Sequence, residues 1–156
     1  MRQLRQSSEY AIRALTYLAL RASSDFVVTE RIARELGLPQ HYLAKLLKPF
    51  VDRGVLLSRR GRLGGFRMNR APEQLTLQEI VAVHEPPTAL RACMLGPQCP
   101  GPPDECPLHE LNRRLAHDLE AVLRVTTLAD LVRYCSEHSD SGYPSGAIGA
   151  ARPSMP

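Results

Sequence analysis

The segment 93–109 constrains the fold most, because it combines three cysteines with many Gly and Pro residues. Cys93, Cys99 and Cys106 are spaced C-x5-C-x6-C, and His109 follows three residues later. Proline cannot donate a backbone hydrogen bond and glycine weakens regular structure, so neither a continuous helix nor a central strand can form here. The segment is therefore predicted to be a shaped loop that presents thiols.

Several interpretations of this loop remain open. Thiolates suit iron–sulfur centres, and a stiff loop can wrap a compact cluster. A structural zinc site fits less well, because zinc sites usually pair cysteines as C-x2-C. A disulfide framework is disfavoured, because the N-terminal residues do not resemble a secretory signal. The pattern favours a cluster held by three thiolates and one further ligand, with zinc or incidental thiols as alternatives.

The charges are unevenly distributed along the 156 residues. Residues 1–70 contain 14 Lys and Arg against 5 Asp and Glu, a net charge of +9, whereas residues 71–156 carry −5. This asymmetry indicates that the front half binds an anionic polymer, and a basic membrane-surface helix is the less favoured alternative. The chain has no run of about 18 apolar residues that would predict a membrane span. A cytoplasmic protein is expected.

The basic half has the pattern of a helix-turn-helix. A first helix over 9–22, capped by Ser7 or Ser8, precedes a helix over 30–36 that Thr29 caps. Gly37 can form the turn, Pro39 can open a helix over 39–53, and Leu43 can anchor that helix. The opposite face carries Gln40, His41, Lys45 and Lys48, which could reach base edges or phosphates. An ordinary helical hairpin with a solvated face is the alternative.

A basic hairpin follows directly. Residues 55–58 and 66–69 read as two strands, and residues 59–65 form an Arg- and Gly-rich turn between them. A two-stranded hairpin with a cationic tip after a helix-turn-helix is typical of a wing that approaches phosphates or the minor groove. The candidate DNA contacts are Thr29, Pro39, Gln40, His41, Lys45, Lys48, Arg59, Arg60, Arg62 and Gly64.

The acidic half is predicted to be helical on both sides of the cysteine loop. A short helix over 77–84, capped by Thr76, precedes the loop, and a long helix over 108–124 follows it. Leu111, Leu115, Leu119 and Leu123 form a stripe that is predicted to meet its twin in a homodimer, with packing onto its own domain as the alternative. After Thr126 and Thr127 a shorter helix continues to about Cys135, which reads as a packed thiol.

The expected fold is mainly α. Residues 1–85 form a winged helix-turn-helix domain with a small two-stranded wing, and residues 86–107 form the cluster-binding loop. Residues 108–136 form the dimerisation helices, including one long C-terminal helix, and residues 137–156 form a disordered tail.

The chain resembles the Rrf2 family of bacterial regulators, in particular its IscR- and NsrR-like members. The resemblance covers about residues 1–135. It rests on Ser-Glu-Tyr-Ala-Ile-Arg-Ala-Leu at 8–15, Tyr-Leu-Ala-Lys-Leu-Leu at 42–47, Arg-Gly-Arg-Leu-Gly-Gly-Phe at 60–66, and the three-cysteine loop. It implies a homodimer with a cluster in each subunit that controls binding to double-stranded DNA. The second cysteine gap is six residues here, whereas several members have five.

The resemblance also implies a fourth ligand, for which the candidates are His109 and Glu9 donated by the partner subunit, with solvent or a small thiol as the remaining alternative. The resulting hypothesis is a transcription regulator, most simply a repressor, that senses redox state, nitric oxide or iron–sulfur status through a 2Fe–2S or 4Fe–4S cluster. A DNA-binding protein with structural zinc or thiol–disulfide sensing is one alternative. An iron–sulfur electron-transfer or assembly protein is the other. No catalytic arrangement is apparent, so an enzyme is not expected.

Overall fold

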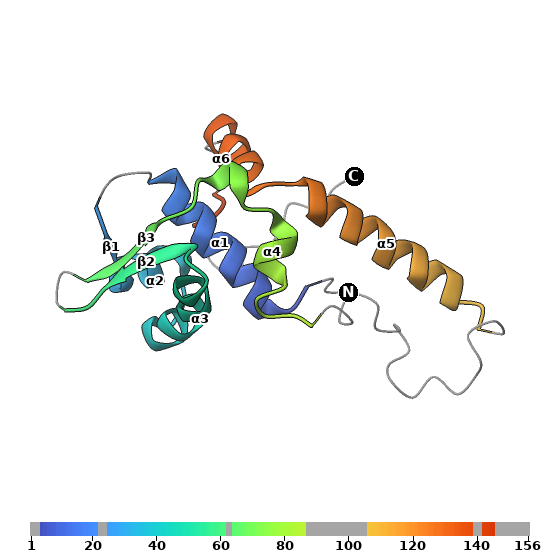
Figure 1. Cartoon of the computed structure of the whole chain (residues 1–156), viewed down its shortest axis with the longest axis horizontal. Helices are drawn as coiled ribbons and strands as arrows, with labels where there is room; N and C mark the ends of the chain where they lie inside the picture. Colours follow the sequence, from blue (N-terminus) through green and yellow to red (C-terminus); the bar gives the residue numbers. More distant parts are fainter. Residues whose placement is uncertain (1–3, 22–24, 62–63, 87–105, 139–141, 146–156) are drawn as a thin grey trace.

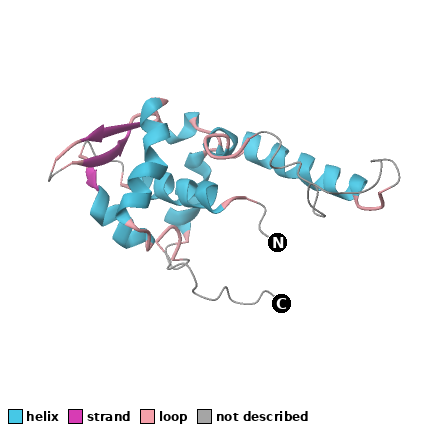
Figure 2. Ribbon diagram, turned by 90° about the horizontal axis from the view of Figure 1, so that it is seen from below, coloured by secondary structure: helices cyan, strands magenta, loops and turns pink. Residues whose placement is uncertain are grey.

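The computed structural model describes residues 4–21, 25–61, 64–86, 106–138 and 142–145. Two views show a body of packed helices with a small sheet at one end and one long helix, α5, that projects from the other end (Figures 1 and 2). The elements are α1 (Gln6–Leu20), β1 (Val27–Val28), α2 (Thr29–Leu36), α3 (Gln40–Asp52), β2 (Leu56–Arg59), β3 (Gly65–Met68), η1 (Pro72–Gln74), α4 (Leu77–Val81), α5 (His109–Val125) and α6 (Leu128–Glu137).

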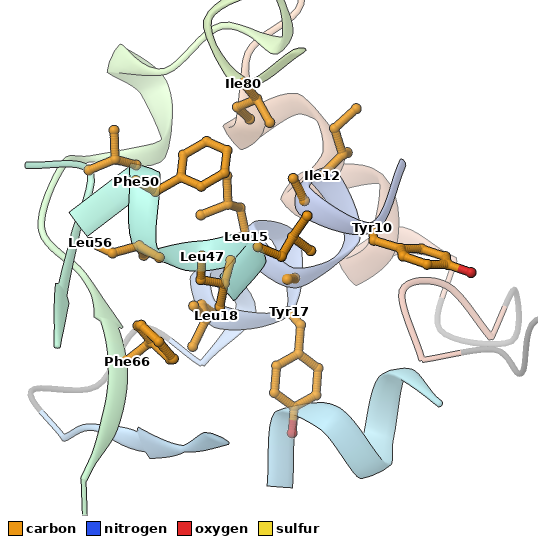
Figure 3. Packing of buried hydrophobic residues seen from close by; sticks show 14 of the residues in the cluster. Tyr10, Ile12, Leu15, Tyr17, Leu18, Leu47, Phe50, Leu56, Phe66 and Ile80 are labelled. Carbon is orange, nitrogen blue, oxygen red and sulfur yellow. The ribbon is translucent and has the colours of Figure 1, made fainter. Parts of the chain in front are cut away.

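Helix α1 is the centre of the core. Every residue from Tyr10 to Ala19 is buried, because α2, α3, α4 and α6 all pack around it. Figure 3 shows Leu15, Leu47 and Phe50 converging from α1 and α3. The predicted cap by Ser7 or Ser8 is wrong: the helix begins at Gln6 with Arg5 as its N-cap residue. The buried Glu85 carboxylate accepts the Arg5 N–H at 2.8 Å, so a distant residue supplies the cap.

The predicted helix-turn-helix is confirmed. Helix α2 ends at Gly37, whose φ of 66° is in the left-handed region that glycine adopts without a steric cost. The Leu38 N–H donates to the Ala33 carbonyl at 2.8 Å, which closes the turn. Ala33 and Leu43 are buried where the two helices meet. Thr29 is the first residue of α2 rather than its cap, because the N-cap residue is Val28.

The wing is part of a three-stranded antiparallel sheet with the order β1-β3-β2. The predicted strands are β2 and β3, and the short β1 joins the free edge of β3 through the pairs Val27–Phe66 and Val28–Gly65. Gly65 makes this pairing possible, because a Cβ atom there would lie 2.0 Å from the Val27 carbonyl oxygen. The sheet therefore ties the wing to the strand that leads into α2.

Two capping boxes begin the helices of the back half. The Thr76 hydroxyl accepts the Glu79 N–H in α4, and the Thr127 hydroxyl accepts the Asp130 N–H in α6. These two threonines also form an isolated antiparallel bridge. Leu128 is fully buried in the core, and α6 packs against α1. Residues 128–137 therefore pack on the N-terminal helix α1, although the sequence analysis grouped them with the dimerisation helices.

Part of the tail predicted to be disordered also packs on α1. Pro144 is buried, and its carbonyl accepts a hydrogen bond from Arg13 Nε at 2.9 Å. The Arg13 guanidinium is itself buried and also faces the Leu36 carbonyl at 3.4 Å. Burial raises the pKa of Tyr143 to about 12. A charged side chain on α1 therefore holds residues 142–145, which hydrophobic periodicity does not reveal.

We expect a chain that ends at His138 to be less stable than the full chain by roughly 2–4 kcal/mol, because it loses the burial of this segment and an acceptor for a buried charge. A chain that ends at Ser145 is the control, and its stability should change by no more than about 0.5 kcal/mol. Urea denaturation measures both. Equal stability of the two truncated chains would contradict the packing role of residues 142–145.

No helix in the described ranges is long and apolar enough to cross a membrane.

Candidate nucleic-acid interface and metal ligands

Helix α3 has two different faces. Its inner face packs on the core, and its outer face carries polar side chains. Leu43, Leu46, Leu47 and Phe50 are buried. Gln40, His41 and Lys45 are exposed, and so is Pro39, the N-cap residue. Lys48 is also exposed, and its Nζ contacts the Asp52 carboxylate at 2.8 and 3.1 Å. An exposed ion pair of this kind contributes little to stability, so Lys48 can exchange Asp52 for a phosphate.

The wing presents two of its predicted arginines at the surface. Arg59 and Arg60 are exposed at the end of β2, and the Arg59 guanidinium lies 4.7 Å from the centre of the Phe26 ring. Arg62 lies outside the described residues. Gly64 is buried rather than exposed, and its N–H donates to the Gly61 carbonyl at 2.9 Å. A Cβ at Gly64 would lie 2.1 Å from the Arg59 carbonyl oxygen, so this glycine shapes the turn.

Helix α2 adds basic residues that the sequence analysis missed. Arg31 and Arg34 are exposed, whereas Ile32, Ala33 and Leu36 face the core. The first helix of a helix-turn-helix usually crosses the DNA backbone, so these two arginines are further candidates for contacts with phosphates. Their spacing of three residues opposite a buried stripe is the sequence signal that could have identified them.

The structure places two of the candidate metal ligands at one end of α5. Cys106 is half-buried with a free thiol, and His109 is exposed in the first turn of the helix. The His109 N–H donates to the Cys106 carbonyl at 3.0 Å, so a single turn joins the two residues. Cys93 and Cys99 lie outside the described residues. Within the described part of the chain, no three His, Cys, Asp or Glu side chains gather as a metal site.

Glu9 lies on another element. It is half-buried in the first turn of α1, in the body of the molecule. Helix α5 begins at its outer end, away from that body (Figure 1). Within one chain the structure therefore does not bring Glu9 together with Cys106 and His109.

Glu110, the residue after His109, already has other partners. Hydrogen bonds from Arg113 and then Arg114 lower the pKa of Glu110 to about 2, so this carboxylate is already engaged.

The fourth cysteine lies on another helix. Burial raises the pKa of the Cys135 thiol. A protonated thiol is a poor metal ligand, and Cys135 is buried on α6, as the sequence predicts.

The leucine stripe of α5 divides into two parts. Leu123 is buried in the core of its own chain, and Leu119 is half-buried against that core. Leu111 and Leu115 are 48% and 41% exposed, as expected for side chains on the projecting part of the helix. The prediction that all four leucines face a partner is therefore wrong for Leu123, which packs within its own chain.

Comparisons with known proteins agree with this architecture. The model of the Rrf2 family, described as iron-dependent transcriptional regulators, matches residues 4–134. An HTH-type transcriptional regulator of Aquifex aeolicus is 30% identical over 131 residues, which are 83% of this chain and 90% of that protein. The HTH-type transcriptional regulator NsrR of Bacillus licheniformis is 30% identical over 137 residues, which cover 83% of this chain and 92% of that protein.

Two solved structures are also similar. CymR, the global cysteine regulator of B. subtilis, is 27% identical with a TM-score of 0.68 over 86% of this chain and 98% of that chain. IscR of T. potens matches at a TM-score of 0.67 and 24% identity, over 86% of this chain and 88% of that chain. At this identity, the similarity is evidence for the fold alone. These relatives are regulators and not enzymes. The chain thus belongs to the Rrf2 family of winged-helix transcriptional regulators.

Proposed function

We propose that this regulator is a homodimeric repressor whose binding to its operator is controlled by an iron–sulfur cluster held by Cys93, Cys99 and Cys106. The observation that carries the proposal is the position of Cys106. Its free, half-buried thiol lies at the outer end of α5, one turn from the exposed His109. A sensor placed there adjoins the helix that carries the exposed leucines.

The chemistry of the donors fits such a cluster. Three soft thiolates suit an iron–sulfur centre, and a borderline imidazole or a hard carboxylate can take the remaining position on iron. His109 can approach the cluster from the same chain. Glu9 would have to come from the partner subunit, because it lies in the body of its own chain. A bound cluster would supply a redox-active group, and the protein residues would hold the loop against the start of α5.

Changing Cys106 to Ala tests the sensor. We expect the variant to lose visible absorption, iron and sulfide, and its affinity for an operator selected in vitro to change about 5- to 150-fold. Cys135→Ala is the matched control and should keep both properties, because Cys135 is buried in α6. Absorption spectra, metal and sulfide assays and fluorescence anisotropy with DNA measure these effects.

Other outcomes would identify the competing functions. Zinc without sulfide in the anaerobically purified protein would indicate a structural zinc site. Operator release on oxidation without any metal would indicate thiol–disulfide sensing. A cluster in a chain that binds no DNA would favour electron transfer or assembly. His109→Ala and Glu9→Ala then separate the two candidates for the fourth ligand, because only the true ligand should shift the spectrum of the cluster.

The exposed part of α5 tests the dimer. We expect Leu111→Asp with Leu115→Asp to give monomers, because each leucine buried in an interface contributes roughly 1.5–3 kcal/mol and a dimer loses both from each subunit. These two leucines are chosen because Leu119 and Leu123 also support the core of their own chain. Analytical ultracentrifugation measures the oligomeric state.

His117→Asp with Arg124→Asp, on the polar face of α5, is the control for the dimer and should leave its mass unchanged. A leucine variant that sediments like the wild type would rule out this interface. Loss of the dimer should also weaken operator binding, because paired recognition helices need half-sites about 34–36 Å apart.

A further inference from the structure

His84 connects α4 to the recognition helix α3. It lies in the turn after α4, where its backbone N–H donates to the Val81 carbonyl at 3.0 Å. Its ring meets the Phe50 ring edge to face, with 5.6 Å between the centres and 63° between the planes. The imidazole also lies within hydrogen-bonding reach of the Leu46 backbone. Both contacts are made on the inner face of α3.

This part of α3 has a weakened backbone. Pro49 lies inside the helix, so the Lys45 carbonyl has no intrahelical N–H to accept. The proline ring also crowds that carbonyl, which disturbs the turn that contains Leu46. The His84 ring therefore contacts α3 beside the turn in which the helix lacks one of its own hydrogen bonds. Lys45 and Lys48, two candidate DNA contacts, project from the same turn.

The surroundings of the ring define its protonation. His84 Nε2 is buried and has no hydrogen-bond partner among the described residues, which leaves Nδ1 as the donor to Leu46. Burial lowers the pKa of His84 from its ordinary value of 6.5, the Leu46 bond opposes this effect, and the Arg53 charge adds to it while Glu85 opposes it. Burial thus favours the neutral ring, in which an Nδ1–H group can donate to Leu46.

We infer that His84 is a positioning residue for DNA recognition, which holds α3 through its contacts with Leu46 and Phe50 so that the polar face of the helix fits the major groove. Contacts with phosphates from the wing and α2 do not depend on this alignment. Loss of His84 should therefore weaken binding to the operator more than binding to unrelated DNA.

Two variants of similar length test the inference in the full chain. His84→Met removes the donor, and His84→Gln retains one. We expect the methionine variant to bind the operator selected by the wild type roughly tenfold more weakly, the usual effect of one lost buried hydrogen bond. Its binding to unrelated DNA should change by less than about twofold. The glutamine variant should recover most of the operator affinity.

His138→Gln is the matched control. His138 Nδ1 also faces a backbone carbonyl, that of Tyr134 at 3.0 Å, and its ring stacks on an aromatic ring 4.4 Å away, but it lies at the end of α6. Its operator affinity should equal that of the wild type. A purely structural role for His84 would lower both affinities in proportion to the unfolded fraction, and glutamine would not recover the specificity ratio. Either result would overturn the inference.

A second measurement needs no variant. The ¹⁵N chemical shifts of the wild-type ring should show a neutral His84 with its proton on Nδ1 at pH 7. A proton on Nε2 or a charged ring would contradict the contact with Leu46, even if His84→Met failed to fold. Metal content is measured in every sample, so that a change in the proposed cluster cannot be mistaken for a change in the alignment of α3.

Discussion

Gly65→Ala is expected to destabilise the winged-helix domain by about 3 kcal/mol, near the upper end of what overpacking usually costs. The added Cβ would lie 2.0 Å from the Val27 carbonyl oxygen and 2.8 Å from the Val28 Cα atom. Both atoms belong to backbone, so no side-chain rotation can relieve the overlap. Strand β1 must then separate from β3, and the entry into α2 loses its support. Thermal and urea denaturation measure the loss.

Gly54→Ala is the matched control, because it makes the same chemical change without an overlap. Gly54 has a φ of 69°, and a Cβ there would have no neighbour within 4 Å. Its cost should be only the left-handed backbone strain of about 1–2 kcal/mol. If the two variants were equally stable, the close approach of β1 to Gly65 would not be what requires glycine.

Charge reversal in the wing should have the second large effect, on DNA affinity. We expect Arg60→Glu with Arg62→Glu to weaken binding to operator and unrelated DNA alike by about 100-fold, because two phosphate contacts become repulsive. The slope of log K against log salt should also become shallower by about 2. Fluorescence anisotropy over a salt series measures both quantities.

Arg124→Glu with Arg133→Glu changes the net charge equally and is the control. Arg124 lies in the last turn of α5 and Arg133 lies on α6, which is on the other side of the body from α3 (Figure 1). Only a small loss of DNA affinity is expected from this pair, because the long-range electrostatic attraction between the protein and DNA becomes weaker. A wing variant that binds as tightly as this control would show that the wing does not contact phosphates.

Short-range patterns were sufficient to predict the helix-turn-helix. Gly37 ends α2 in a left-handed conformation. That conformation depends only on residues in the same turn, so the local sequence was enough to predict it. Thr76 and Thr127 cap their helices through partners three residues away. The wing hairpin also pairs neighbouring segments. In each of these elements the interacting groups are close in the chain, so their spacing contains the information.

The cap of α1, the third strand and the position of the tail depend on distant partners. Arg5 is capped by Glu85, 80 residues away, and Arg13 holds Pro144, 131 residues away. Strand β1 has only two residues, and it forms because Gly65 lets it approach β3. No local pattern could have indicated these pairs.

The candidate site shows the same division. The sequence by itself determined the basic face of α3, the cationic wing and the order of the three thiols, because residue type and spacing define the chemistry available. Only the tertiary structure decided that Leu123 belongs to the core while Leu111 and Leu115 face outward, and that His84 reaches Leu46. A periodic stripe shows which face of a helix is apolar, but the positions of the surrounding elements determine what that face contacts.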